Sequence, residues 1–341
     1  MRRTTFGLLA IALLGMTATP ARAGLDALAA AASKEGEVTW YVSQTDSATA
    51  DAAAHAFTGL YPAIKVNVVR TTTGIAYQRL TQDLRENSPH CDVFSTTDLG
   101  QYATLKQHGA LAAYAPQNAR GLSPEFQNFD PDGTYYPTYA GMVVIAYNTK
   151  KLTADQAPKS WRALADPMWK GKLSLGHPAF SGYVGNWVVE LKKLYGWDYF
   201  ERLARNDPLV SRSIIDTVTV LNSGERVVAV SPSPSALESI DKGNPLAVIY
   251  PEEGAILMIA PSAVLASAPH PNAGRLFLEF LLGPAYAEVT VKSRGESLRP
   301  DVPALPGFTS FRQVKTVHLP VKDVLDGIPT VTEQWRDTFG G

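Results

Sequence analysis

Short apolar runs along this chain alternate with longer segments in which apolar residues recur every three or four positions. Runs of the first kind predict buried strands, and segments of the second kind predict amphipathic helices. Nearly continuous apolar strands that alternate with helices indicate a mostly parallel sheet covered on both faces. In the first part of the chain the expected elements are a strand at 38–42, a helix at 48–60, a strand at 64–69, a helix from Gly74, a strand at 92–94 and a helix that Gly109 ends.

The same alternation begins again in the second half of the chain. No Pro/Gly-rich linker separates the halves, so short strands are expected to cross between two lobes. The sequence therefore predicts an α/β fold of two lobes, each a mostly parallel sheet flanked by helices, with hinge strands between them. The expected elements are strands at 143–147 and 173–175, a helix after Ser181, a βαβ unit made of 227–230, 235–242 and 246–249, and a helix from Pro271 to Pro284.

The N-terminus has the layout of a cleavable secretory signal. Two arginines precede an apolar run at 6–16, and Ala21-Arg22-Ala23 supplies a small-residue cleavage site. The apolar run is shorter than the roughly 20 residues that a transmembrane helix needs. We therefore expect residues 1–23 to be removed and the remaining chain to reside in the periplasm.

Composition gives no sign of a nucleic-acid partner. The chain has 31 basic and 32 acidic residues, and removal of the signal leaves 28 basic against 32 acidic residues. No basic stripe interrupts this balance, so neither nucleic acid nor an anionic membrane surface is expected as a partner. Cys91 is the only cysteine, which excludes an internal disulfide, and its position beside a buried strand predicts an inert core thiol.

The usual catalytic signatures are absent from the sequence. It contains no G-x-S-x-G, no P-loop, no G-x-G-x-x-G and no H-E-x-x-H. Six histidines are scattered without metal-ligand spacing, and only His177 follows a strand at a suitable place. His177 with Glu253 is the one titratable pair that a secreted enzyme could use. We expect a binding protein without metal or cofactor, and the enzyme hypothesis depends on that pair.

Small polar residues follow the strands of both predicted lobes, where helices begin. Ligands of open α/β sheets bind outside the carboxyl ends of the strands, and helix N-termini attract anions. Each of these residues can instead be a simple N-cap, but five such loops in two lobes favour a shared cleft. Arg70, at the end of the second strand, can pair with a ligand oxygen or with a surface acid. The five loops are 43–45, 71–74, 95–98, 181–183 and 231–235.

Residues 159–172, KSWRALADPMWKGK, resemble the SW-x-x-L-x-D-P-x-W-K-G-K stretch of bacterial extracellular solute-binding proteins. The resemblance is to the ferric-iron-binding and related type II periplasmic class. Residues 144–149 and 250–254 and the helix at 271–284 also fit, so it extends from about residue 36 to residue 300. It implies two α/β lobes, crossed by hinge strands, that close over a ligand and deliver it to the membrane permease of an ABC importer.

The resemblance weakens at the metal site. Ferric-binding relatives use a histidine after the first strand, an acid after the third strand and a tyrosine pair in the second lobe. Here Thr45 and Thr97 stand at the first two positions, and 228–235 contains no tyrosine. Hydroxyls are poor ligands for a hard ferric ion. Ser181-Gly182-Tyr183, by contrast, matches the Ser-Gly loop with which those relatives hold a synergistic anion.

The sequence is therefore interpreted as a monomeric periplasmic solute-binding protein that captures a small organic anion, a phosphate ester, phosphonate or carboxylate. The alternatives are a ferric-iron-binding protein with an exogenous synergistic anion, and a protein that presents its ligand to a sensory receptor. The residues expected at the ligand are the donors Ser43, Thr45, Thr72, Thr97, Ser181, Gly182 and Ser231, the cations Arg70 and His177, and the walls Tyr139 and Tyr183.

The same interpretation divides the chain into three parts. Residues 1–23 form the signal peptide. The first lobe takes 24–141 plus 253–299, and the second lobe takes 142–252 plus 300–341. The stretch after Arg299 is expected to pack across the second lobe.

Overall fold

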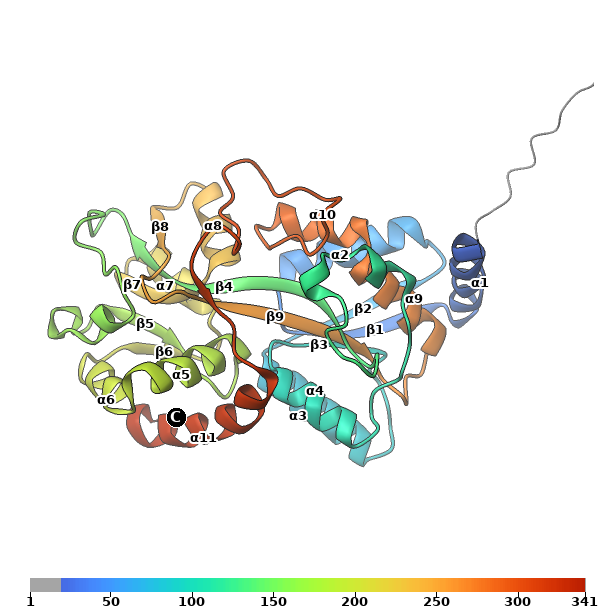
Figure 1. Cartoon of the computed structure of the whole chain (residues 1–341), viewed down its shortest axis with the longest axis horizontal. Coiled ribbons are helices and arrows are strands. Elements are labelled where there is room, and N and C mark those ends of the chain that lie inside the picture. Colours follow the sequence, from blue (N-terminus) through green and yellow to red (C-terminus); the bar gives the residue numbers. More distant parts are fainter. Residues whose placement is uncertain (1–19, 341) are drawn as a thin grey trace, which may run out of the picture.

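The chain forms two α/β lobes that share one sheet (Figure 1). The structure, a computed structural model, describes residues 20–340. The predicted signal sequence lies outside this range except for residues 20–23, which begin the first helix. The strands are β1 (Glu37–Val42), β2 (Lys65–Arg70), β3 (Val93–Ser95), β4 (Tyr136–Asn148), β5 (Leu173–Gly176), β6 (Leu209–Ser211), β7 (Val228–Pro232), β8 (Leu246–Ile249), β9 (Ala255–Val264) and β10 (Thr316–Val317).

Helices cover both faces of this sheet. The strand order is β2-β1-β3-β9-β4-β7-β5-β6, with β10 paired to β9 and β8 paired to β4. The α-helices are α1 (Pro20–Glu35), α2 (Ser47–Leu60), α3 (Thr73–Arg85), α4 (Leu99–Gln107), α5 (Gly182–Tyr195), α6 (Asp198–Arg205), α7 (Asp216–Ser223), α8 (Ser233–Asp241), α9 (Pro271–Leu282), α10 (Pro284–Lys292) and α11 (Val321–Phe339). Four short 3₁₀ helices lie at Gln117–Gly121, Pro124–Phe126, Arg162–Ala165 and Pro167–Trp169.

Two long antiparallel strands, β4 and β9, run through both lobes (Figure 1). They contain 13 and 10 residues, so the expectation of short crossing strands is wrong. Their side chains are buried along almost the whole length and alternate between two cores. Met142 and Val144 pack into a core of the first lobe, whereas Val143 and Ile145 pack into the core of the second. Cores on both sides of the ribbon therefore hold these strands in place.

The first lobe has three parallel strands, as the apolar pattern predicts. β1 lies between β2 and β3, and all three run in the same direction. On one face Trp40 contacts Phe277 of α9, with ring centroids 5.1 Å apart. On the other face Tyr41 and Phe94 pack with α3 and α4. The alternation of side chains along β1 thus explains why helices are needed on both sides.

The second lobe repeats this plan with β5 parallel to both β6 and β7. Trp161, Trp187 and Trp335 are fully buried in its larger core. β7 and β8 are both antiparallel to β4, so they are parallel to each other, and β4 lies between them. The predicted βαβ unit at 227–249 is therefore present, with one strand inserted.

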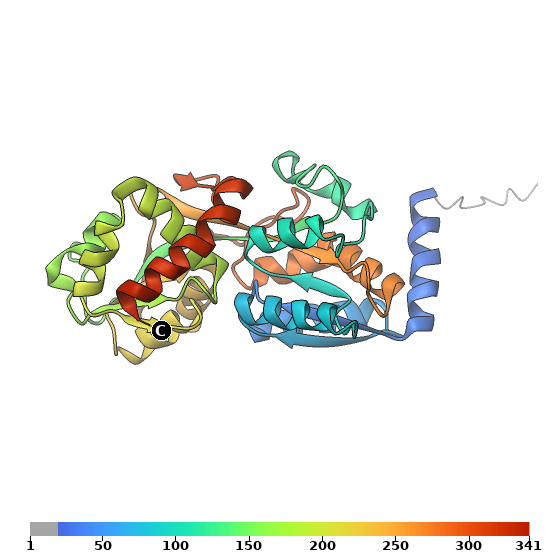
Figure 2. The same ribbon diagram turned by 90° about the horizontal axis from the view of Figure 1, so that it is seen from below.

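The C-terminal helix α11 contacts both lobes, not only the second. It packs against α5 of the second lobe and α4 of the first, and Figure 2 shows it lying along the second lobe and reaching toward the first. A Cβ atom on Gly100 of α4 would lie 3.1 Å from the Cα atom of Leu325. Small residues thus allow α11 to approach closely.

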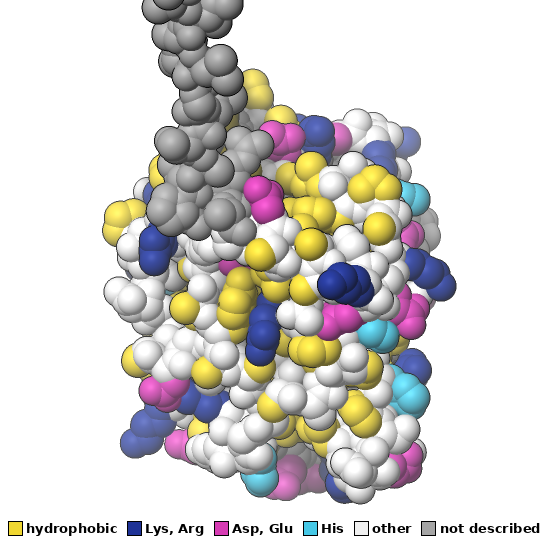
Figure 3. Space-filling view, turned by 90° about the vertical axis from the view of Figure 1, so that its right-hand side faces the viewer, with side chains coloured by type: hydrophobic (Ala, Val, Ile, Leu, Met, Phe, Trp, Pro, Cys, Tyr) yellow, Lys and Arg dark blue, Asp and Glu magenta, His cyan; other side chains and the backbone are white. Residues whose placement is uncertain are grey.

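The end face of the first lobe carries Lys, Arg, Asp and Glu side chains interspersed with apolar ones (Figure 3). No helix in residues 20–340 has both the length and the apolar character needed to cross a membrane.

Candidate functional site

Strand register brings the polar loops of each lobe to one edge of the sheet. Val42 of β1 pairs with both Arg70 of β2 and Ser95 of β3. The loops after these strands consequently begin side by side. In the second lobe the loops after β5, β6 and β7 meet in the same way, because Gly176 pairs with Ser211 of β6 and Ser174 pairs with Ala229 of β7, both in parallel register.

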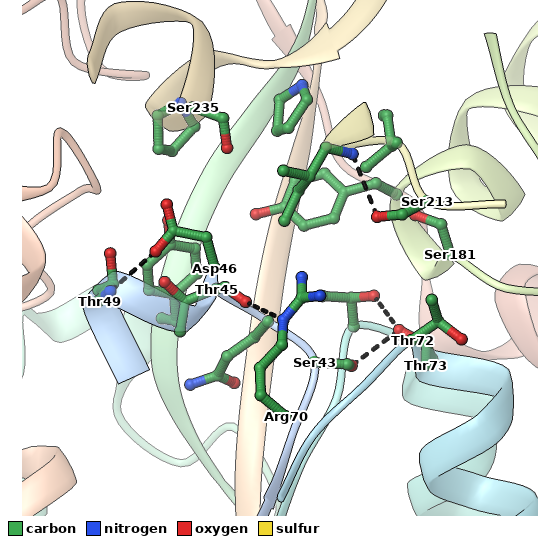
Figure 4. A pocket seen from close by; sticks show the side chains of 18 of the residues that line it. Ser43, Thr45, Asp46, Thr49, Arg70, Thr72, Thr73, Ser181, Ser213 and Ser235 are labelled. Atoms are coloured by element: carbon green, nitrogen blue, oxygen red, sulfur yellow. Dashed lines mark hydrogen bonds between the residues drawn. The ribbon is translucent and has the colours of Figure 1, made fainter. Parts of the chain in front are cut away.

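Loops of both lobes line one pocket, seen from close by in Figure 4. With the lobes as they lie, its volume is about 30 Å³, which is room for no more than a few water molecules. The first lobe contributes Ser43, Gln44, Thr45, Asp46, Thr49, Arg70, Thr72, Thr73, Thr97, Tyr139 and Ser293. The second lobe contributes Phe180, Ser181, Tyr183, Ser213, Ile214, Ile215, Pro232, Pro234, Ser235 and Glu238.

Direct contacts hold the two sides of the pocket together. The backbone N–H of Thr73 donates to the carbonyl oxygen of Phe180 at 3.0 Å. The N–H of Gly182 donates to Oγ1 of Thr97 at 3.1 Å. A ligand of several heavy atoms can therefore enter only when the lobes move apart.

Four helices that begin beside this region, α2, α3, α4 and α5, have N-cap residues that behave in two ways. Asp46 and Asp98 are ordinary caps, since their carboxylates accept from the backbone N–H groups of Thr49 and Gly100. Thr72 and Ser181 also occupy N-cap positions, yet neither side chain makes a capping hydrogen bond. The Oγ1 atom of Thr72 is buried and has no hydrogen-bond partner within residues 20–340. The N-cap explanation therefore accounts for the two aspartates and not for Thr72 or Ser181.

A chain of hydroxyl groups forms the floor of the pocket. Oγ1 of Thr73 lies 2.8 Å from Oγ of Ser43 and 2.9 Å from Oγ1 of Thr97. Ser43 and Thr97 thus keep each other in position through Thr73, which was not among the expected ligand residues. Thr73 follows Thr72 directly, so the loop was recognisable from the sequence although this residue was not chosen.

Arg70 is the cation of the pocket. Its Nε donates to the carbonyl oxygen of Thr45 at 3.0 Å, and no carboxylate in the described part of the chain forms an ion pair with it. Burial lowers the pKa of Arg70, and the nearby charges of Asp46 and Asp216 raise it in part. The guanidinium is therefore desolvated without full compensation from the protein.

Two tyrosines line the pocket. Tyr139 lies on β4 and Tyr183 on α5, and both side chains are buried. Burial raises the pKa of both phenols well above the usual value, so both remain neutral hydroxyls over the physiological range. They can donate hydrogen bonds or pack against a ligand.

Three expected ligand residues do not line the pocket. The His177 ring packs against Phe180 and Trp335, and burial, helped by Arg336, lowers its pKa, so it carries little charge at neutral pH. Ser231 is fully buried and bonds to Thr217 Oγ1 at 2.7 Å. The third, Gly182, uses its N–H to contact the other lobe.

The His177–Glu253 pair that an enzyme would need is not formed. Glu253 accepts hydrogen bonds from the backbone N–H groups of Trp161 and Arg162 and from the hydroxyl of Tyr195. These bonds lower its pKa against the effect of burial. Glu253 thus has a structural role at the start of a 3₁₀ helix.

The sequence reasoning missed Asp46, Ser213 and Glu238 as pocket residues. Asp46 could have been found, because it directly follows the 43–45 loop and precedes a helix. Ser213 follows the short strand β6, which had no recognisable apolar pattern. Glu238 lies one turn into α8, and nothing in the sequence shows that this helix faces the other lobe.

Within residues 20–340, no group of three or more His, Cys, Asp and Glu side chains is placed to hold a metal ion.

The carboxyl group of Asp98 should make the stability of the protein depend on pH. Burial raises its pKa to about 6, against the lowering effect of hydrogen bonds from Gly100 and Gln101. Its protonated form is thus favoured in the folded protein, and this contribution to stability is present below the unfolded pKa near 4 and lost as pH rises through 6. Asp98→Asn keeps a cap without the charge. From pH 4 to pH 7 the parent should therefore lose stability relative to the variant. The difference between their free energies of unfolding should change by on the order of 1–2 kcal/mol. A difference that is the same in urea titrations at both pH values would contradict this.

Comparison with known proteins places this geometry in context. Residues 88–308 match the family described as bacterial extracellular solute-binding protein. Among curated relatives, the "probable ABC transporter periplasmic-binding protein" of Sinorhizobium fredii is 22% identical over 63% of this chain and 62% of its own length. The "putative 2-aminoethylphosphonate-binding periplasmic protein" of Salmonella typhimurium is 24% identical over 89% of this chain and 84% of its own length.

Solved structures share the fold. The periplasmic binding protein AfuA of Actinobacillus pleuropneumoniae, with fructose-6-phosphate bound, superimposes with a TM-score of 0.81 at 22% identity, covering 89% of this chain and 98% of AfuA. Iron-bound HitA of Pseudomonas aeruginosa gives a TM-score of 0.75 at 23% identity, covering 89% of this chain and 99% of HitA. The predicted fold, that of type II periplasmic binding proteins, is confirmed.

Proposed function

We propose that this chain, which belongs to the family of bacterial extracellular solute-binding proteins, captures a small organic anion between its lobes in the periplasm. It would then deliver this ligand to the membrane permease of an ABC importer. The family membership and the Sinorhizobium relative support the transport role. The ligand class is argued from the pocket, because the named ligands of the relatives differ: an aminophosphonate, a sugar phosphate and iron.

One observation carries the choice of an anion. Arg70 lacks an ion-pair partner among the described residues, and Thr72 and Ser181, at the starts of two helices from different lobes, leave their hydroxyls uncommitted to capping. Helix N-termini and a guanidinium both favour a negatively charged oxygen. An anion that bridges Arg70 and Ser181 would contact both lobes, and it would therefore stabilise their contact by its differential affinity for that arrangement.

The test is a thermal-shift screen of the mature protein. Phosphate esters, phosphonates and mono- and dicarboxylates are compared with ferric salts, added with and without phosphate. A ligand that binds only the folded state stabilises it by about 2.7 kcal/mol at a hundred times its dissociation constant. We expect an organic anion to raise the melting temperature in a concentration-dependent way. A shift with ferric ion alone would overturn the proposal in favour of iron binding.

A matched pair of variants localises the binding. Ser181→Ala removes a hydroxyl from the pocket wall and should weaken binding of the same anion about tenfold to a hundredfold, because one hydrogen bond to a charged group contributes roughly 1.5–3 kcal/mol. Ser223→Ala, which removes an exposed hydroxyl at the end of α7, should leave the affinity unchanged. Equal affinities of the two variants in calorimetric titrations would exclude Ser181 from the site.

A further inference from the structure

The pocket contains two carboxylates that a site for a simple anion does not explain. Asp46, the N-cap of α2, belongs to the first lobe, and Glu238 of α8 belongs to the second. Oδ1 of Asp46 accepts from the N–H of Thr49 at 2.8 Å, and no cation within residues 20–340 forms an ion pair with Asp46. Glu238 pairs with the exposed Lys242 through one oxygen at 2.6 Å.

These carboxylates face the same space from opposite lobes. Both line the pocket together with Tyr139 of β4, and both add to the effect of burial in raising the pKa of that phenol. The negative charge of Asp46 also raises the pKa of Arg70, although the two side chains are too far apart for an ion pair. The pocket therefore holds a positive and a negative side chain that are close enough to interact and yet do not contact each other.

Within the pocket, Asp46 and the hydroxyl groups around Thr73 lie on different sides of Arg70. Figure 4 shows Asp46 and Ser235 on one side of Arg70, and Ser43, Thr72, Thr73 and Ser181 on the other. Gln44 also lines the pocket and is 3% exposed, and its Oε1 has no hydrogen-bond partner in the described part of the chain. Its amide nitrogen is already used, because it donates to Thr138 and Tyr286. Gln44 thus offers an unused buried acceptor.

Charge balance decides between two kinds of ligand. A ligand that carries only negative charge would gain from Arg70 but would be repelled by Asp46, whose charge no ion pair offsets, and by the oxygen of Glu238 that Lys242 leaves unpaired. Such like-charge contacts disfavour a partner. A ligand with a negative group at one end and a protonated amine at the other would satisfy both sides. It would also supply N–H donors, which the carboxylates and the Gln44 oxygen can accept.

We propose that the ligand is a small zwitterion, whose phosphonate, phosphate or carboxylate group binds at Arg70 and the hydroxyls while its protonated amine binds between Asp46 and Glu238. This inference rests on the proposed function, since it concerns the same pocket. Asp46 and Glu238 are then specificity-determining residues, and each lobe supplies one of them.

Pairs of compounds that differ only in the amine test the inference. The pairs are 2-aminoethylphosphonate with ethylphosphonate, O-phosphoethanolamine with ethyl phosphate, and β-alanine with propionate, each titrated calorimetrically into the mature protein. In at least one pair the amine-bearing member should bind about tenfold or more tightly, as expected for a charge-assisted contact in a closed pocket. If the amine-free members bind as tightly, the zwitterion inference fails and the anion proposal stands. If no member of any pair binds, the zwitterion inference fails as well, and the anion proposal is decided by the wider screen.

Charge-neutral variants assign the effect to residues. Asp46→Asn keeps an N-cap side chain, so the start of α2 is preserved, and Glu238→Gln keeps the length of the side chain. Each should reduce the preference for the amine several-fold while the affinity for the amine-free member stays the same or rises. Asp51→Asn, on the exposed face of α2, is the control and should change neither value. A preference that survives in the double variant Asp46→Asn/Glu238→Gln would overturn the assignment.

Discussion

Replacing Gly182 with alanine is expected to weaken ligand binding about a hundredfold without unfolding either lobe. A Cβ atom at this position would lie 2.1 Å from the carbonyl oxygen of Thr97 and 2.8 Å from the backbone nitrogen of Asp98. Both atoms belong to the backbone of the other lobe, so no side-chain rotation relieves the clash. Overpacking of this kind typically costs 1–3 kcal/mol, and about 1.4 kcal/mol corresponds to a tenfold change in affinity.

The loss appears in binding because the clash exists only when the lobes touch. Alanine at the first position of α5 favours the helix, so the separated lobes keep their stability. Apparent affinity then falls with the fraction of molecules that can close. Gly74→Ala should behave alike, since its Cβ would lie 2.3 Å from the carbonyl oxygen of Ala179.

Two measurements check this, with the tightest-binding compound of the screen as ligand. Calorimetry gives the affinity, and small-angle X-ray scattering gives the radius of gyration at saturating ligand, which should stay larger for Gly182→Ala than for the parent. Gly59→Ala is the control, because nothing lies within 4 Å of a Cβ there. A Gly182→Ala protein that binds and compacts like the parent would show that the lobes do not meet in this way when ligand is bound.

Elements with a local pattern were predictable from the sequence, and those defined by distant contacts were not. The expected strand at 38–42 and helix at 48–60 differ from β1 and α2 by one residue at the N-terminal end. β4 was expected only at 143–147, because Pro137 and Gly141 interrupt a strand that is fixed by pairing with β9. α11 was obscured by Pro329, which the helix accommodates while packing on both lobes.

The residues of the candidate site also fall into those that a local pattern predicts and those that depend on distant contacts. Loops that follow strands can be recognised locally, and eight of the eleven expected ligand residues line the pocket. His177 and Ser231 lie outside the pocket, because a position after a strand does not determine which way a side chain points. Glu238 was missed because its place in the pocket depends on how one lobe sits against the other. The ligand-binding roles of all these residues remain predictions, as does the division of the chain into lobes at 141/142, 252/253 and 299/300.

Arg70→Gln should separate the cost of a buried charge from its benefit to binding. In the parent, burial lowers the pKa of Arg70, which means that the charged form is less well solvated in the pocket than in water. Its one hydrogen bond to the carbonyl oxygen of Thr45 compensates only in part. Glutamine keeps a polar amide and removes the charge, so the ligand-free variant should be as stable as the parent or more stable.

The affinity of Arg70→Gln for the anionic ligand should fall. Hydrogen bonds between charged groups contribute roughly 1.5–3 kcal/mol each, and a guanidinium can make two to one anionic group, so a hundredfold loss of affinity is a conservative expectation. Arg85→Gln, which removes an exposed arginine at the end of α3, should alter neither property. Chemical denaturation measures the stability and calorimetry the affinity. If Arg70→Gln instead loses stability and keeps its affinity, Arg70 is a structural residue and the anionic end of the ligand lies elsewhere. An equal or higher stability together with a hundredfold weaker affinity is the combination that only a ligand-directed charge produces.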